Sequence, residues 1–373
     1  MTDTARRPEM LPVPTLPRDI ETPAVVVDRE RLEDNIRRLQ DAMNERGVAL
    51  RPHAKTHKSV RVAGLQLEAG ARGITVGTIG EAEVFAGAGI TNLFLAYPVW
   101  VEGSKARRLR DVHDAADLRV GVDSEGGAER LAAAVAGARR PLHVLVEIDP
   151  GQHRTGVADP EAAVRVARAA HERGLIVDGV FAHGGHSYDP AARARASSEE
   201  VASLEAAAAA LEAGGFEVAT ISAGSTPTMV ASATGRVNEM RAGTYVLGDR
   251  QQWLLGAIPA QGAAAVVAAT VVSVAADRFV LDAGAKSLTK DRADWIEGYG
   301  GLPRYPDAVI ERLSDYHGVV RLLPGSPRPR LGEVVAVVPN HICPVIDLFD
   351  AFWVVGADGS SEPWPVDARG RSS

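Results

Sequence analysis

The segment from Arg51 to Lys58, RPHAKTHK, places five basic side chains within eight residues. Lys55 stands inside it, directly after the strand-like run Val48–His53. Burial at the end of a strand would lower the pKa of a lysine amine and make it a nucleophile, and a neighbouring cation such as Lys58 or His57 would act in the same direction. The segment therefore predicts either a reactive lysine or an ordinary basic loop.

Two further loops follow apolar runs and carry side chains that could bind a small ligand. Arg154 lies in a loop flanked by glycines after the run Leu142–Ile148. It could contact an anionic group there, or it could be a surface arginine. His183 and His186 come just past the run Leu175–Ala182, which makes both imidazoles candidates for the same site.

Small residues and glycines are concentrated in two later segments, Ser222–Thr228 and Arg241–Tyr245. Backbone N–H groups and hydroxyls in such segments can hold a phosphate, and barrels often bind phosphate after their last strands. A sequence such as Gly-Ser-Thr-Pro is equally compatible with a plain turn. Each segment alone is therefore a weak indication of an anion site.

His341 and Cys343 stand two residues apart at the end of a strand-like run. Alternation along a strand would point both side chains to the same side. Imidazole and thiolate together suit Zn²⁺, and two ligands suit an open site that water or substrate completes. The alternative is a buried cysteine beside a histidine that has its hydrogen bonds satisfied.

These residues must be positioned by the elements between them, and strand-like runs alternate with helical patterns from Ala24 to about Gly248. Such alternation is typical of parallel strands, and eight runs suggest a (β/α)₈ TIM-type barrel, with a doubly wound open sheet as the alternative. The eight runs are Val48–His53, Gly73–Gly77, Asn92–Tyr97, Leu118–Val122, Leu142–Ile148, Leu175–Ala182, Glu217–Ser222 and Arg236–Leu247.

The sequence after Gln251 has few helical patterns and predicts a second, C-terminal, mainly β domain. The expected division is a barrel over residues 28–250 and a β domain over residues 251–373, joined by an N-terminal strand within residues 18–27. Barrels carry their chemistry at the C-terminal ends of their strands. Five of the candidate residues fall just past strand-like runs, as a barrel site requires: Lys55, Arg154, His183, His186 and Ser225.

The composition excludes several classes of protein. The chain has 373 residues, of which 46% are hydrophobic and 24% charged, as in an ordinary globular protein. A net charge of −7 gives no basic surface for nucleic acid, and no apolar run is long enough to cross a membrane. The single cysteine excludes an internal disulfide and fits a reducing compartment, most simply the cytoplasm.

The motifs RPHAKTHK, HRTGV, AHGGHSY, GSTPT, RAGTYVLGDRQQ and PNHIC occur in the order seen in the D-serine dehydratase / D-threonine aldolase family, which the chain resembles over roughly residues 22–348. These are fold-type III pyridoxal-phosphate (PLP) enzymes related to alanine racemase. The resemblance implies a PLP-binding barrel, a C-terminal β domain and a homodimer with active sites near the interface. The lysine segment and the His-x-Cys pair are its most specific parts.

The resemblance also implies roles for particular residues. Lys55 matches the lysine that binds PLP as a Schiff base, Arg154 an arginine near the PLP ring hydroxyl, and Arg241 the arginine that faces the pyridine nitrogen in alanine racemases. His341 and Cys343 match the zinc pair of eukaryotic-type D-serine dehydratases. Another divalent metal such as Mn²⁺ is the alternative for this site. Some D-threonine aldolases carry His-x-Asp there. The remaining residues expected to bind the cofactor are His183, Ser225, Thr226, Gly243, Thr244 and Tyr245.

The resemblance makes a lyase acting on small D-β-hydroxy amino acids the leading hypothesis, most simply a D-serine dehydratase that forms pyruvate and ammonia. Lys55 would remove the α-proton and the metal would stabilise the departing hydroxide. One departure keeps D-threonine and D-3-hydroxyaspartate aldolases or dehydratases open, because D-serine dehydratases often carry asparagine where His186 stands. In an aldolase His186 would take the hydroxyl proton. An alanine-racemase-type isomerase and a PLP carrier without turnover are the remaining alternatives.

Lys55 is expected to be the only lysine that binds PLP covalently. The purified protein should be yellow, and borohydride should fix the cofactor on the peptide that contains Lys55. Peptide mapping by mass spectrometry checks this. Label on Lys58 or Lys286 in place of Lys55 would show that the assignment is wrong.

Overall fold

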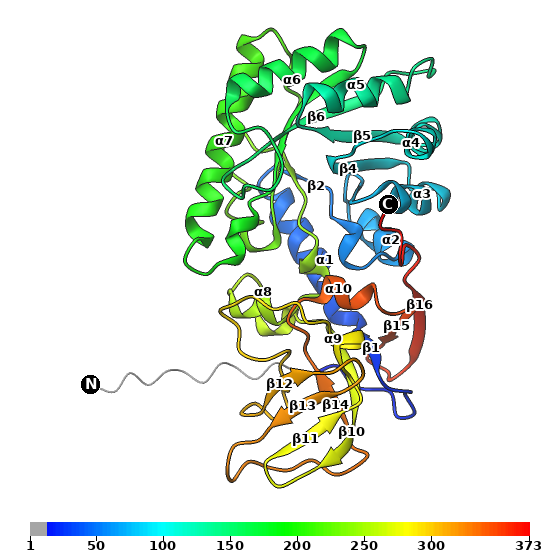
Figure 1. Cartoon of the computed structure of the whole chain (residues 1–373), viewed down its shortest axis with the longest axis vertical. Helices are drawn as coiled ribbons and strands as arrows, with labels where there is room; N and C mark the ends of the chain where they lie inside the picture. The colour runs from blue at the N-terminus through cyan, green and yellow to red at the C-terminus, as the bar shows by residue number, and fades with distance from the viewer. Residues whose placement is uncertain (1–12) are drawn as a thin grey trace, which may run out of the picture. The chain divides into compact units, whose positions relative to one another are not determined.

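The computed structural model describes residues 13–373, and the chain divides into two units (Figure 1). The barrel unit comprises Ile36–Gly243 together with Gly370–Ser373. The β unit comprises the residues up to Asn35 together with Thr244–Arg369. Helix α1 (Arg29–Asn44) begins in the β unit and ends in the barrel unit, and its apolar face of Leu32, Ile36, Leu39 and Met43 is buried as its spacing predicts.

Eight parallel strands form the barrel unit, in the order β2-β9-β8-β7-β6-β5-β4-β3. A parallel bridge between His53 and Thr75 joins the chain after β2 to β3. The predicted TIM-type barrel is therefore confirmed. The strands are β2 (Ala49–Leu50), β3 (Ile74–Val76), β4 (Asn92–Pro98), β5 (Asp117–Val122), β6 (His143–Ile148), β7 (Ile176–Ala182), β8 (Thr220–Ala223) and β9 (Glu239–Met240).

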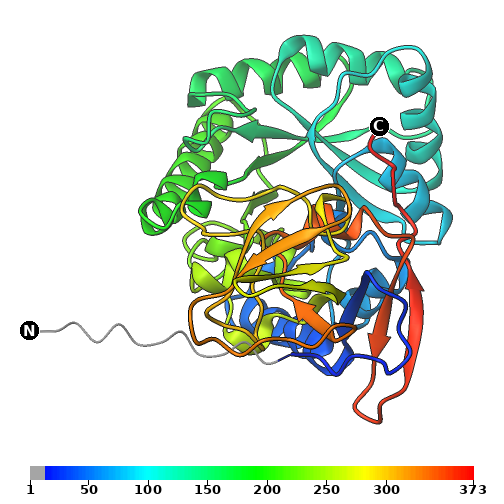
Figure 2. The ribbon, with the colours of Figure 1, turned by 60° about the horizontal axis from the view of Figure 1, so that its bottom comes forward.

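The helices between the strands lie on the outside of the barrel, and Figure 2 shows them as an arc around the strands. Three of them begin at the N-cap residues Thr78, Ser124 and Asp159, whose side chains accept a backbone N–H from the first turn and so fix where each helix starts. The helices are α2 (Val60–Glu68), α3 (Ile79–Gly87), α4 (Ser104–Ala115), α5 (Glu125–Ala134), α6 (Pro160–Glu172) and α7 (Arg193–Ala213).

Aromatic packing fills part of the barrel interior. Phe94, Leu145 and Phe181 form a buried cluster, and the two phenyl rings meet edge to face with centroids 5.1 Å apart. Gly121 is required beside them because a Cβ there would lie 2.6 Å from the Phe181 ring. Leu145 and Glu147 are two apart on β6, so both side chains point to the same face of the strand.

The last barrel strand is much shorter than predicted. The run Arg236–Leu247 reads as one strand in sequence, but only Glu239–Met240 pairs as β9. The chain then leaves the sheet and forms the 3₁₀ turn η4 (Thr244–Val246), all of whose residues are buried. Burial of a non-strand segment gives the same apolar pattern as a buried strand, and this is why the periodicity was misleading.

The β unit contains a sheet in the order β12-β13-β11-β10-β1-β15-β16, with β14 paired to β10. Strand β1 runs antiparallel to β10 and parallel to β15, so a segment from the start of the chain lies inside this sheet. The strands are β1 (Ala24–Asp28), β10 (Ala265–Val274), β11 (Arg278–Leu281), β12 (Val309–Leu313), β13 (Gly318–Arg321), β14 (Val334–Val337), β15 (Ala351–Val355) and β16 (Ser361–Pro365).

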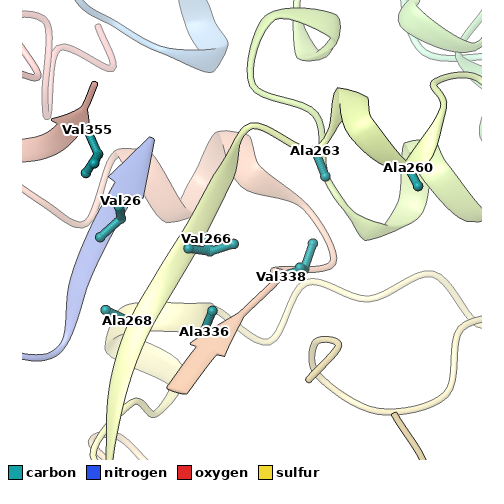
Figure 3. Close-up of a cluster of buried hydrophobic side chains, with 8 residues drawn as sticks. All are labelled: Val26, Ala260, Ala263, Val266, Ala268, Ala336, Val338 and Val355. Atoms are coloured by element: carbon teal, nitrogen blue, oxygen red, sulfur yellow. The ribbon is translucent and has the colours of Figure 1, made fainter. Parts of the chain in front are cut away.

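Small apolar side chains form the core of this second unit, where Val26, Val266, Val338 and Val355 pack with four alanines (Figure 3). Three short helices accompany the sheet: α8 (Arg250–Leu254), α9 (Ala285–Leu288) and α10 (Ile342–Ile346). The mainly β second domain expected from the sequence is therefore confirmed. No helix within residues 13–373 has the length and apolar character needed to cross a membrane.

Candidate active site

Lys55 lies in the 3₁₀ turn η1 (Ala54–Thr56) that follows β2. The residue is exposed, so the expectation that burial activates this lysine is wrong. Neither neighbour supplies the expected free cation. The Lys58 ammonium lies 3.6 Å from the Glu81 carboxylate, and burial lowers the pKa of His57 to about 4, which keeps that imidazole neutral. The turn presents Lys55 at the C-terminal end of the barrel.

Five side chains from four strand ends form the barrel-mouth cluster: His53 and Lys55 after β2, Arg154 after β6, His183 after β7 and Arg241 after β9. Desolvation lowers the pKa of His53, and the charges of Lys55 and Arg241 lower it further. Desolvation also lowers the pKa of His183, with contributions from Lys55, Arg154 and Arg241. Both imidazoles are therefore neutral, and the charge of the cluster comes from one lysine and two arginines. A site with this charge suits an anionic ligand.

Arg241 is buried and is held in one position. Its Nη1 donates to Ser222 Oγ at 2.6 Å and its Nη2 to the Ala182 carbonyl at 2.5 Å. Its guanidinium also lies over the rings of Phe94 and Phe181, at 5.7 and 5.2 Å from their centroids. Contacts on so many sides fix the orientation of the charge inside the barrel.

The loops after β7 and β8 are joined through hydroxyl groups. Ser225 Oγ lies 2.9 Å from Ser187 Oγ and 3.0 Å from Thr228 Oγ1, and Thr226 begins the turn η3 (Thr226–Thr228). Gly243 approaches the Lys55 loop so closely that a Cβ there would lie 3.0 Å from the His53 carbonyl oxygen. The loops after β7 and β8 thus meet each other, and the Gly243 segment meets the Lys55 loop.

Glu200, on α7, connects the loops after β7 and β8 through hydrogen bonds to both. Its fully buried carboxylate accepts the N–H of Gly184 at 3.0 Å and the N–H of Gly224 at 2.9 Å. It also accepts the hydroxyls of Ser232 at 2.7 Å and Thr228 at 3.3 Å. The sequence analysis did not identify this residue, because a glutamate in a long helix reads as an exposed one.

His186 lies in the turn η2 (Gly185–Tyr188) and is paired with a carboxylate. Its Nε2 is 2.9 Å from Glu199 Oε2, while its buried Nδ1 has no hydrogen-bond partner among residues 13–373. A carboxylate that receives one ring N–H leaves the other nitrogen as an acceptor. His186 thus has the hydrogen-bonding arrangement of a base, with Glu199 as a partner that the sequence analysis missed.

Thr244 and Tyr245, expected to contact the cofactor, belong to the β unit, and Tyr245 is buried there. Thr244 Oγ1 lies 3.6 Å from the sulfur of Cys343, so the threonine is a neighbour of the candidate metal pair. The structure brings Lys55, Arg154, His183 and Arg241 together in the barrel unit. It places Thr244 with the His341–Cys343 pair in the β unit.

His341 and Cys343 are not on a strand, so the argument from strand alternation is wrong. Strand β14 ends at Val337, and His341 is the N-cap of α10. The chain turns because the Ile342 N–H donates to the buried Asp249 carboxylate at 3.1 Å and Asn340 Nδ2 donates to the Gly298 carbonyl at 2.9 Å. The two side chains are nevertheless hydrogen-bonded to each other.

Asp291 lies on the other side of the imidazole, with Oδ2 2.5 Å from His341 Nδ1. Burial lowers the pKa of His341, but the Cys343 thiolate, the Asp291 hydrogen bond and the Asp249 charge outweigh it and raise the pKa to about 11. A carboxylate on one ring nitrogen is the usual support for a metal-binding histidine. Within residues 13–373 no three histidine, cysteine or acidic side chains form a complete metal cluster. An imidazole held by a carboxylate beside a thiol is a donor pair that fits a divalent metal such as Zn²⁺.

The barrel and the β unit have the architecture of fold-type III enzymes. Residues 27–251 match the family model of the alanine racemase N-terminal domain, and residues 264–355 match a D-serine dehydratase domain. The first match alone covers more than half of the chain. The chain belongs to this family of dehydratase and aldolase lyases, as the motifs indicate.

Three relatives match nearly the whole chain. D-threo-3-hydroxyaspartate dehydratase of Delftia sp. (strain HT23) is 36% identical over 92% of this chain and 97% of its own. D-threonine aldolase of Arthrobacter sp. is 33% identical over 97% of both chains. D-serine dehydratase of Schizosaccharomyces pombe is 26% identical over 92% of this chain and 91% of its own.

Two solved structures have the same fold throughout. D-threonine aldolase of Filomicrobium marinum superposes with a TM-score of 0.87 at 32% identity, covering 94% of this chain and 96% of its own. A cysteine-to-alanine mutant of D-threo-3-hydroxyaspartate dehydratase, solved in the metal-free form, has a TM-score of 0.83 at 34% identity and covers 93% of this chain and 97% of its own.

The family implies PLP, and the residues of the barrel unit fit that cofactor. The barrel-mouth cluster is cationic, as the phosphate and ring oxygen of PLP require. Lys55 is exposed and so accessible to an aldehyde. The cationic donors and the accessible amine thus agree with PLP as the cofactor.

Substituting Glu200 with glutamine should loosen the loops after β7 and β8. An amide places N–H groups where four donors now converge, so at least one buried donor loses its acceptor, at a cost of about 1–3 kcal/mol in unfolding free energy. Urea denaturation measures this. Glu212→Gln, an exposed position on the same helix, is the matched control and should change stability little. Equal effects of the two substitutions would contradict the role given to Glu200.

Proposed function

We propose that the protein is a PLP- and divalent-metal-dependent lyase that dehydrates D-β-hydroxy amino acids, with D-threo-3-hydroxyaspartate as the first substrate to test. The observation that carries the proposal is the His341–Cys343 pair supported by Asp291. This choice departs from the D-serine dehydratase favoured by the motifs. The relatives named for 3-hydroxyaspartate and threonine match the chain at higher identity than the D-serine dehydratase does.

The metal pair supports dehydration over aldol cleavage. The 3-hydroxyaspartate dehydratase has been solved with a histidine and, separately, a cysteine replaced by alanine, and those two residues are two positions apart, as His341 and Cys343 are. The cysteine variant is the one in the metal-free form. Some D-threonine aldolases, by contrast, carry His-x-Asp at this place. We therefore assign the metal, most simply Zn²⁺, to His341 and Cys343.

The barrel residues take the remaining roles. PLP, when bound, supplies an electron sink that stabilises negative charge at the α-carbon. We assign to Lys55 the covalent attachment of PLP and the removal of the α-proton. Arg154 and Arg241 bind the ring, and the cofactor phosphate is held by Ser225, Thr226, Gly243 and Thr244. His183 and Tyr245 complete the set of cofactor-binding residues.

The residues of the β unit act on the β-hydroxyl. The metal, when bound, stabilises the negative charge that develops on the departing oxygen. Asp291 accepts the Nδ1 proton of His341 and so holds the imidazole with its other nitrogen available as a ligand. We also propose a homodimer, as the resemblance implies.

An assay of products tests the proposal. Protein supplied with PLP and Zn²⁺ should convert D-threo-3-hydroxyaspartate to oxaloacetate and ammonia, and D-serine, less well, to pyruvate and ammonia. Chelation and Cys343→Ala should each abolish the reaction, and added Zn²⁺ should restore only the chelated wild-type protein. Asp277→Asn, an exposed change in the same unit, is the control and should retain activity. Glycine and glyoxylate as the products would identify an aldolase, and full activity in metal-free protein would exclude the metal role.

A second candidate function, aldol cleavage, is favoured by the His186–Glu199 pair, because a carboxylate-supported imidazole suits a base for the β-hydroxyl. His186→Asn distinguishes the two reactions. In a dehydratase His186 need only orient substrate or water, so kcat should fall less than about tenfold, whereas loss of a general base costs ~10²–10⁴-fold. Glu199→Gln provides a companion measurement. Collapse of activity in His186→Asn, together with aldehyde products, would replace the dehydratase by the aldolase.

A further inference from the structure

Glu147 is a buried carboxylate that the proposed reaction leaves without a role. It is 2% exposed and lies near the end of β6, on the same face of the strand as Leu145 of the interior cluster. Its Oε1 accepts the Thr155 hydroxyl at 3.0 Å. Its Oε2 has no hydrogen-bond partner among the described residues. A buried oxygen without a donor is costly, which indicates that a further donor reaches it in some state of the protein.

The loop that follows β6 folds back on the end of that strand, next to Glu147. The Asp149 N–H donates to the Val157 carbonyl and the Val157 N–H donates to the Glu147 carbonyl, both at 2.9 Å. Asp149 also accepts the N–H groups of Gly151 and His153, at 2.9 and 3.0 Å. The loop is therefore closed at its base, and Thr155 lies against the Glu147 carboxylate.

Arg154, next to Thr155 in this loop, is the donor that the geometry offers. Its guanidinium is exposed and forms no hydrogen bond or ion pair within the part of the chain that the structure describes. Its charge nevertheless acts on Glu147. An unpartnered cation thus lies in this closed loop, one residue from the threonine that donates to a carboxylate whose other oxygen has no partner among the described residues.

We propose that Glu147 is the positioning residue for Arg154: its Oε1 fixes the loop through Thr155, and its Oε2 receives the Arg154 guanidinium when the anionic cofactor is bound. The inference rests on the proposed function, which assigns Arg154 to bound PLP. A carboxylate that accepts N–H groups on one edge of a guanidinium keeps the N–H groups of the opposite edge directed at the ligand.

The charges around Glu147 explain why this pairing belongs to the ligand-bound protein. Burial raises the pKa of Glu147 to about 7, while the Thr155 hydrogen bond and the charges of Arg154 and Arg241 lower it and the charge of Asp123 raises it. The carboxyl is therefore readily protonated without ligand. The deprotonated form binds a guanidinium more tightly than the neutral acid does, so loss of this proton should strengthen binding of the cofactor through Arg154.

The same electrostatics make Glu147 unfavourable for stability. Between its ordinary pKa of 4.5 and about 7, the folded chain retains a proton at Glu147 that the unfolded chain has lost, so stability falls as pH rises through this window. Glutamine reproduces the neutral form that the folded chain tolerates. Glu147→Gln should therefore fold, and without cofactor it should melt at a higher temperature than the wild type at pH 8.

Titration of the cofactor-free protein with PLP, followed by absorbance between pH 6 and 8, tests the proposal. Wild-type affinity should rise with pH relative to Glu147→Gln, which should bind about tenfold more weakly at pH 8, the size of one lost charge-assisted hydrogen bond. Glu161→Gln, exposed on α6, is the matched control and corrects for the titration of PLP itself. Thr155→Val, which keeps the carboxylate but removes the loop contact, should give a smaller loss.

A double-mutant cycle separates positioning from a general effect of charge. If Glu147 acts through Arg154, then adding Glu147→Gln to Arg154→Gln should weaken PLP binding no further. Additive losses, or wild-type affinity and pH dependence in Glu147→Gln and Thr155→Val, would overturn the inference while leaving the proposed function intact. A wild-type protein that binds no PLP would refute both.

Discussion

The carboxylate of Glu239 balances charges that lie inside the barrel. Arg51 is fully buried and donates from Nε to Glu239 Oε2 at 2.9 Å. The Ser222 hydroxyl donates to Glu239 Oε1 at 2.7 Å and accepts Arg241 Nη1 at 2.6 Å. Removing one partner of such a buried pair typically costs about 3–5 kcal/mol, because the other charge remains buried alone. Arg241 can be positioned as a site residue only because this network neutralises it.

The network also places negative charge at one end of the barrel strands. Arg119 extends it, with Nε 3.2 Å from Asp178, and Asp178 lies 2.7 Å from His143 at the start of β6. Most carboxylates of this network thus lie toward the N-terminal ends of the strands. The cations Lys55, Arg154 and Arg241 lie at the other end of the strands, and their positive charge suits an anion there.

The sequence predicts the barrel well because parallel strands buried on both faces read as apolar runs. It predicts the positions of Lys55, Arg154 and His183 because a barrel requires them to follow strands. The sequence does not predict which residues from distant segments contact each of these side chains. Lys55 is exposed, Lys58 is paired with Glu81, and His341 caps a helix, and all three depend on contacts between distant segments. One signal was available in sequence, since Glu147 is an isolated acid within the apolar strand β6.

Three glutamates of the barrel unit show how the number of donors decides what a buried carboxylate can do. Glu239 lies near Arg51, Arg119 and Arg241 and accepts a serine hydroxyl. Burial raises its pKa, but Arg51, the Ser222 hydrogen bond and the charge of Arg241 outweigh that effect, and the pKa is lowered. Glu200 accepts four hydrogen bonds and has no free capacity to bind anything else. Glu147 has one donor, and burial raises its pKa. A carboxylate that is fully satisfied contributes to the fold, whereas one that is not retains both a proton near neutral pH and an oxygen for a ligand-dependent contact. The same side chain is therefore structural at two positions and available for function at the third.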